Sequence, residues 1–177
     1  MDPTRALVVC YSRSDTTWQV AHAIRKELGC DIERIVDTKP RHGVIGYLRS
    51  GFDALFHRPT VLRPLSNDPS NYDLVIVGTP IWNASVSAPV RAFLAEHRDR
   101  MKQVAFFCTY GGRGSARALH QMEEICGQKP VMTLAFRTDE VTHGAFDVKI
   151  RSFASALRTK PVSDLPPRVT NLRPVHA

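Results

Sequence analysis

Hydroxyl side chains gather directly after the first apolar run of the chain, residues 7–11. The six positions that follow the residue at 11 are Ser12, Arg13, Ser14, Asp15, Thr16 and Thr17. A helical pattern begins next, with Val20, Ile24 and Leu28 four residues apart. A strand that turns into a helix in this way leaves the first backbone N–H groups of the helix unpaired, and together with hydroxyls and the helix dipole they suit a phosphate. The run therefore predicts an anion site, although Ser14 or Asp15 could simply cap the helix.

Two later segments could surround a flat aromatic ligand. The first follows a continuous apolar run at 72–78 and consists of Thr79, Pro80, Ile81, Trp82 and Asn83. The second ends another apolar run at 104–109 and includes Thr109, Tyr110, Gly111, Gly112 and Gly114. An indole can stack on a flat ligand, and glycine lets the backbone approach the ligand's edge closely. We expect both segments at the site, with packing inside the protein as the other interpretation of Trp82.

Strands and helices alternate along the chain, which implies a parallel sheet with helices on both faces. The predicted strands are 5–11, 30–36, 72–78, 104–109 and 131–136, and the predicted helices are 16–28, 88–97, 115–126 and 145–157. Gly29 and Gly127 follow two of these helices, at the position where glycine commonly ends a helix. Five such units match the strand order 2-1-3-4-5, in which ligands bind at the carboxyl ends of the strands near the switch point. All three polar segments lie at such ends.

Taken together, the three segments resemble the flavodoxin family, over about residues 6–157. Ser-Arg-Ser-Asp-Thr-Thr resembles the phosphate loop of that family, Gly-Thr-Pro-Ile-Trp its second flavin loop, and Thr-Tyr-Gly-Gly-Arg-Gly its third. The resemblance implies a flavodoxin-like three-layer α/β sandwich that binds flavin mononucleotide (FMN) without a covalent bond. It implies that the cofactor-binding residues are those at 12–17, 79–83, 109–112 and 114.

Two positions depart from the family's pattern. Asp15 stands where the family usually has glycine, and its carboxylate would repel the phosphate unless it turned outward or were screened by Arg13. We expect it to point to solvent, and we expect FMN binding to be weaker than in family members with glycine here. Asn83 follows Trp82 where the family usually has glycine, and asparagine reaches positive φ more readily than most residues. No aromatic residue clearly matches the family's second stacking tyrosine, and Tyr110 is the nearest candidate.

The resemblance implies an electron-transfer flavoprotein whose partner is a redox protein or a small-molecule electron acceptor. One alternative is an FMN-dependent reductase that passes hydride from NAD(P)H to a quinone or similar acceptor. Another is a cofactor-free interaction module on the same fold. We predict no catalytic side chain, because the cofactor itself performs the redox chemistry.

The composition of the chain argues against several other classes of protein. The 177 residues are 43% hydrophobic and 23% charged, as expected for a soluble globular protein with one main core. No apolar run approaches the roughly 20 residues of a membrane span, and the start of the sequence lacks a secretory signal, so we expect a cytoplasmic location. The net charge of +7 comes from scattered residues without a nucleic-acid motif, so we expect no nucleic-acid partner. The four cysteines lack paired spacing and predict reduced thiols rather than disulfides or a metal site, with Cys108 a buried hydrophobe rather than a redox thiol.

The predicted domain spans residues 1–158, and a proline-rich tail at 159–177 is expected to be disordered. An excess stretch at 39–71 separates the second and third strands, and its centre at 43–56 has helical periodicity. We expect an extra crossover helix there. Alternatively, Tyr47 or Phe52 could help to wall the flavin.

Overall fold

The computed structural model describes residues 5–38 and 61–159 of the chain. The helix predicted at 43–56, with Tyr47 and Phe52, lies outside the described residues. So does the predicted tail, except for its first residue.

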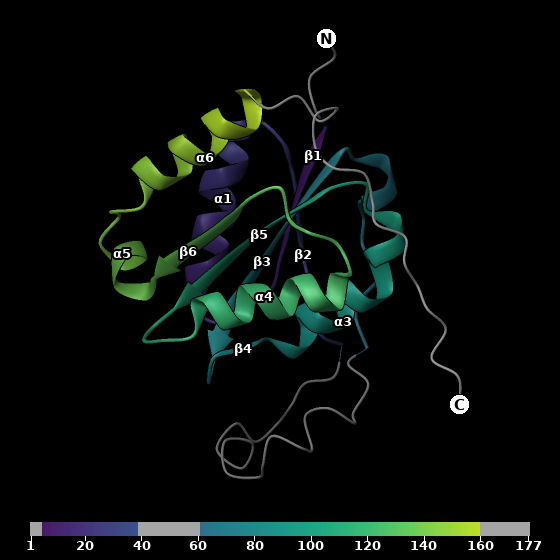
Figure 1. Ribbon diagram of the computed structural model, residues 1–177, viewed down its shortest axis with the longest axis horizontal. Helices are drawn as coiled ribbons and strands as arrows, with labels where there is room; N and C mark the ends of the chain where they lie inside the picture. Colours follow the sequence, from purple (N-terminus) through teal and green to yellow (C-terminus); the bar gives the residue numbers. More distant parts are fainter. Residues whose placement is uncertain (1–4, 39–60, 160–177) are drawn as a thin grey trace.

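The centre of the structure is a parallel sheet of five strands in the order β2-β1-β3-β5-β6 (Figure 1). The strands are β1 (Ala6–Cys10), β2 (Asp31–Arg34), β3 (Leu74–Trp82), β5 (Val104–Tyr110) and β6 (Thr133–Arg137). This is the predicted order 2-1-3-4-5, counted over the parallel strands alone. A sixth strand of only two residues, β4 (Ser85–Val86), pairs antiparallel with the end of β3 and was not predicted.

Helices cover both faces of the sheet, as predicted (Figure 1). On one face lie α1 (Thr16–Leu28), α5 (Thr138–Thr142) and α6 (Asp147–Thr159), and on the other lie α3 (Ala88–His97) and α4 (Ser115–Cys126). Each face has its own apolar core, and neighbouring residues of a strand contribute to opposite cores. Phe106 packs toward α3 and α4 while Phe107 packs toward α1 and α6. Two-sided burial explains why the central strands are continuous apolar runs without alternation.

Helix ends follow local signals. Helices α1, α3 and α4 have the predicted bounds. Gly29 and Gly127 adopt the left-handed conformation just after α1 and α4, and their N–H groups donate to Arg25 O and Glu123 O. Pro89 occupies the first turn of α3, where a missing N–H costs nothing. The last helix is displaced from the predicted 145–157 to Asp147–Thr159, and residues 143–146 form a turn between it and the short helix α5, which was not predicted.

Strand β3 is the main difference from the predicted elements. The predicted strand ended at Gly78, with Thr79 and Pro80 in the segment after it, but the observed strand continues to Trp82. Strand β1 pairs with β3 only as far as Gly78, so Pro80 lies beyond the end of that neighbour, and β4 begins to pair at Ile81. Proline is tolerated at such edge positions, because no ladder hydrogen bond is lost there.

Between β2 and β3, two backbone hydrogen bonds join residues 36–38 to residues 61–63. The Thr38 N–H donates to Val61 O at 3.0 Å, and the Arg63 N–H donates to Val36 O at 2.9 Å. Residues 61–68 then run without a helix to the 3₁₀ turn η2 (Pro69–Asn71), as expected for a proline-rich return. A second 3₁₀ turn, η3 (Arg98–Arg100), follows α3. Throughout the ranges that the structure describes, every helix is too short or too polar to cross a bilayer.

Gly78 tests the close packing between β3 and β5. A Cβ atom at this position would overlap the ring of Phe107, which is fully buried on the adjacent strand. We expect Gly78→Ala to lower the free energy of unfolding by about 1–3 kcal/mol, the usual cost of overpacking a core. Gly112→Ala is the matched control, because its Cβ would have no neighbour within 4 Å, and it should change stability by less than about 0.5 kcal/mol. Equal midpoints for the two variants in chemical denaturation would contradict the packing described.

Candidate functional site

The three predicted segments meet at one edge of the sheet. Strand register places Cys10 opposite Gly78 and Pro80 opposite Thr109, so β1, β3 and β5 end side by side. The loop after β1 (residues 11–15, the first loop), the β3–β4 turn with its flanks (residues 79–85, the second loop) and the loop after β5 (residues 110–114, the third loop) therefore leave the sheet together. This is the carboxyl edge at the switch point, where α/β proteins bind ligands.

The first loop ends in a helix start without a side-chain cap. Asp15 occupies the N-cap position in the left-handed conformation, with φ of 60°, and its carboxylate makes no cap hydrogen bond. The Ser14 and Thr16 hydroxyls lie 3.4 Å apart, at the long limit of a hydrogen bond. Simple capping by Ser14 or Asp15 therefore does not account for this run of polar residues. The uncapped first turn of α1 retains the electrostatics that favour an anion.

Ser12 contributes a buried hydroxyl without a partner. Its side chain is only 6% exposed, and its Oγ has no hydrogen-bond partner among the described residues. A buried, unpaired hydroxyl costs free energy unless something binds it, so native proteins rarely retain one without a reason. This hydroxyl lies between the end of β1 and the uncapped start of α1, where an anion could accept its hydrogen bond.

A buried hydrogen bond joins the first turn of α1 to the end of β5. The Oγ1 atoms of Thr17 and Thr109 are 2.7 Å apart, and both side chains are buried. The two residues are 92 positions apart in the sequence, so this contact ties the first loop to the third. Each of the two hydroxyls already has a hydrogen-bond partner inside the protein, so these threonines stabilise the site. A ligand could contact their oxygen atoms only in addition to this bond.

The second loop is a tight hairpin turn between β3 and β4. Trp82 pairs with Ser85, and the two residues between them, Asn83 and Ala84, have φ of 50° and 58°. Two positive φ values are the mark of the type I′ turn that joins antiparallel strands. The expectation that Asn83 adopts positive φ is confirmed. Ala84 is the more unusual residue, since a left-handed conformation costs alanine roughly 1–2 kcal/mol.

Side chains of the second loop fall into two groups. Trp82 is 44% exposed and meets the Tyr11 ring edge-on at 6.2 Å, so the indole lies at the surface between the first and second loops. Thr79, Pro80 and Ile81 are buried, and only their backbone could face a ligand. The Thr79 hydroxyl is bonded to Ser87 Oγ at 3.0 Å and to the Pro80 carbonyl.

The third loop packs against the second through a glycine. A Cβ atom on Gly114 would overlap Ala84, and Gly114 itself has φ of 99°. By contrast, Gly111 and Gly112 are exposed with open space around them, and Arg113 is exposed beside them. Tyr110 is half-buried at the end of β5. The three loops are thus in mutual contact, and the surface between them combines one exposed indole with bare backbone.

Several residues at the site were not predicted. Arg34, the last residue of β2, donates to Ser12 O and to the Asp15 carboxylate, whereas the expected screening residue was Arg13. Asp15 does face solvent, as expected. Ser87 and Tyr11 support the second loop. The signal that could have found Arg34 was its place near the carboxyl end of the predicted strand 30–36, which the predicted strand order puts beside the first strand.

The cysteines near the loops are packing residues. All four cysteines are free thiols, and Cys10 and Cys108 are fully buried. Burial raises the pKa of Cys10 and that of Cys108 to about 12, which keeps both thiols protonated at neutral pH. The interpretation of Cys108 as a small buried hydrophobe is confirmed. No group of three or more potential metal ligands occurs within residues 5–38 and 61–159.

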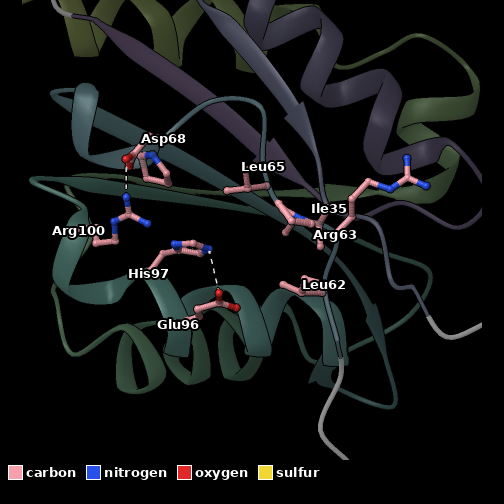
Figure 2. A pocket seen from close by; sticks show the side chains of 10 residues that line it. Ile35, Leu62, Arg63, Leu65, Asp68, Glu96, His97 and Arg100 are labelled. Atoms are coloured by element: carbon pink, nitrogen blue, oxygen red, sulfur yellow. Dashed lines mark hydrogen bonds and ion pairs between the residues drawn. The ribbon is translucent and has the colours of Figure 1, made fainter.

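A separate hollow of about 330 Å³ lies away from the three loops (Figure 2). It lies between the end of α3 and the 61–69 segment, and an ion pair between Asp68 and Arg100 borders it. His97 lies in its wall with a buried Nδ1 that has no partner among the described residues, and burial lowers the pKa of this imidazole. None of the predicted site residues lines this hollow.

Comparison with known proteins connects these features to one family. The model of the NADPH-dependent FMN reductase family matches residues 6–142. That range runs from the first residue of β1 to the last residue of α5 and contains all three loops. No relative was found among proteins with curated descriptions.

Solved structures share the fold at low identity. A flavoprotein from Lactobacillus acidophilus, solved in complex with FMN, aligns with a TM-score of 0.65 and 21% identity, covering 80% of this chain and 99% of that one. A protein from Bacteroides eggerthii gives 0.70 and 19%, covering 89% and 99%. A WrbA-like flavodoxin from Agrobacterium tumefaciens gives 0.53 and 13%, also covering 89% and 99%. These likenesses confirm the flavodoxin-like fold.

Packing between the second and third loops can be tested with Gly114 and Ala84. We expect Gly114→Ala to lower the free energy of unfolding by about 2 kcal/mol, because it adds overlap and strains a positive φ. Ala84→Gly should raise it by about 0.5–1 kcal/mol, since relief of left-handed strain outweighs the entropy that glycine adds to the unfolded chain.

The double variant, Gly114→Ala with Ala84→Gly, tests whether the two residues are in contact. If Gly114 and Ala84 touch, Ala84→Gly should offset part of the loss in Gly114→Ala, with a coupling of about 0.5 kcal/mol or more. Gly111→Ala serves as the control without neighbours. Strict additivity in denaturant unfolding would show that the two loops do not pack as described.

Proposed function

Since this chain belongs to the NADPH-dependent FMN reductase family, we propose that it oxidises NAD(P)H with FMN held where β1, β3 and β5 end. FMN is the flavin of this family. The proposal names the donor, the position of the cofactor and the residues that hold it. The family match covers the whole of the three-loop site, which supports placing the flavin there.

One observation carries the placement of the phosphate. Ser12 Oγ is buried and has no partner in the described part of the chain, and it adjoins an uncapped helix start. A phosphate ester would accept its hydrogen bond and take the unpaired N–H groups of the first turn of α1 as further donors. Ser14, which is exposed, and Thr16, which is half-buried, add hydroxyls beside the same turn, so the residues present fit a phosphate.

Bound FMN supplies the hydride and electron chemistry, and the protein binds, orients and shields it. Trp82 offers an exposed indole face for stacking, and the backbone of Gly111 and Gly112 can approach the edge of the ring without side-chain obstruction. Asn83 and Ala84 hold the intervening turn rigidly at positive φ. Tyr110, at the end of β5, is half-buried, so its ring is only partly available to a ligand.

An electron carrier that serves a protein partner remains the other function for this fold. The net charge of +7 suits an acidic partner or a small-molecule acceptor, because complementary charge raises association rates. The family match favours the reductase. The cytoplasmic location stays a prediction.

Turnover with purified protein separates the two functions. We expect the FMN-reconstituted protein to oxidise NADPH steadily with free FMN or a quinone as acceptor, at a rate in the usual enzymatic range of about 1–10³ s⁻¹. The decrease in NADPH absorbance is the measurement, with the flavin-free protein as the control. Flavin bands in the visible spectrum without any NADPH turnover would favour the carrier instead.

Ser12 tests the phosphate placement separately. We expect Ser12→Ala to weaken FMN binding by about 1.5–3 kcal/mol, or roughly 10- to 150-fold, because one charge-assisted hydrogen bond is lost. Riboflavin, which lacks the phosphate, should bind the variant and the unmodified protein equally. Stability of the flavin-free protein should not fall, because the removed hydroxyl had no partner to lose.

Flavin fluorescence titration measures both dissociation constants. Unchanged FMN affinity in Ser12→Ala would remove the phosphate from this loop. Parallel losses for FMN and riboflavin would mean that the substitution disturbs the site as a whole.

A further inference from the structure

An arginine from the neighbouring strand holds the phosphate loop from outside. Arg34 is the last residue of β2, and strand register places it beside Cys10, the last residue of β1. Its Nη2 donates to the Ser12 carbonyl oxygen at 3.2 Å and to Asp15 Oδ1 at 2.9 Å. One guanidinium NH₂ group carries two hydrogens, so both bonds can form at once. Its Cζ also lies 5.1 Å from the centre of the Trp18 ring, which supports the planar group from the helix side.

These contacts act on the residue least suited to the loop. Asp15 adopts φ of 60°, which glycine reaches without cost and aspartate only at some cost. Its carboxylate also adjoins a helix start where the proposed ligand is an anion, so an unpaired charge here would repel that ligand. The carboxylate does not recover this cost by capping α1, because it makes no cap hydrogen bond.

We propose that Arg34 is a positioning residue that makes this loop compatible with a phosphate. It neutralises Asp15 and draws the carboxylate toward β2, while its second bond fixes the Ser12 carbonyl and hence the direction of the Ser12 side chain. The inference rests on the proposed function, because it assumes that the FMN phosphate binds at this loop. It differs from a direct role, in which the guanidinium itself would contact the phosphate.

A double-mutant cycle distinguishes the two roles. If Arg34 acts by neutralising Asp15, Arg34→Ala should weaken FMN binding about tenfold, because the substitution leaves one unpaired negative charge beside the ligand. In an Asp15→Gly background the same substitution should weaken binding by less than about threefold, because no charge is left to expose. Direct contact with the phosphate would instead give equal losses in both backgrounds.

Two further readouts separate charge from a purely structural effect. The loss in Arg34→Ala should shrink as salt rises from about 0.05 to 0.5 M, since partly exposed charges are screened: the Arg34 side chain is 42% exposed and that of Asp15 63%. Riboflavin affinity should be unaffected by Arg34→Ala, because riboflavin carries no phosphate. Arg25→Ala is the matched control, since Arg25 is an exposed arginine near the far end of α1 and its removal changes the net charge equally.

The outcomes are decisive in each direction. FMN affinity that is unchanged in Arg34→Ala, or a loss equal to that in Arg25→Ala, would overturn the inference. Equal losses with and without Asp15 would replace it with direct phosphate contact. If the unmodified chain bound riboflavin and FMN equally, the phosphate placement itself would fail, and that result is distinguishable because it does not involve Arg34.

Discussion

The parallel pairing of β1 with β3 and of β3 with β5 is the constraint on which the site depends. Parallel strands end at the same edge of a sheet, so the three loops must emerge together whatever their own sequences. The buried bond between Thr17 and Thr109 then fixes the first helix against the third loop. The overlap-free contact of Gly114 with Ala84 joins the third loop to the second. A rigid sheet edge thus becomes one continuous surface made of three chain segments.

Polar groups at this edge divide into those that build the surface and those that are available to a ligand. Thr79 and Ser87 bond each other, and Thr17 bonds Thr109, so these hydroxyls are satisfied within the protein. Ser12 is buried yet unsatisfied within the described residues. In the first kind of hydroxyl the internal hydrogen bond offsets the cost of burial, whereas in the second kind that cost is not offset within the protein. This contrast is why the proposed phosphate position rests on Ser12 and not on the number of hydroxyls at the edge.

Local signals in the sequence predicted much of the fold, and long-range contacts account for the rest. Helices α1, α3 and α4 were predicted with their observed bounds because glycine, proline and apolar periodicity mark their ends. Alternation of strands and helices predicted the parallel sheet, and the strand order came from the flavodoxin-like pattern that five such units match. The extension of β3 past Pro80 was missed because a local break signal was outweighed by pairing with β4 and β5. Arg34 was missed because its partners lie 19 and 22 positions away, and only strand register brings them together. The burial of Thr79 and Ile81 was likewise invisible in a segment that looks like a loop.

The closure between β2 and β3 has a consequence for the length of the chain segment that it encloses. Backbone hydrogen bonds from Thr38 to Val61 and from Arg63 to Val36 hold residues 36–38 against residues 61–63. The entropic cost of closing a chain segment grows only slowly with the length of that segment. A change in the number of residues between Thr38 and Val61 should therefore cost little free energy of folding, as long as these two hydrogen bonds still form.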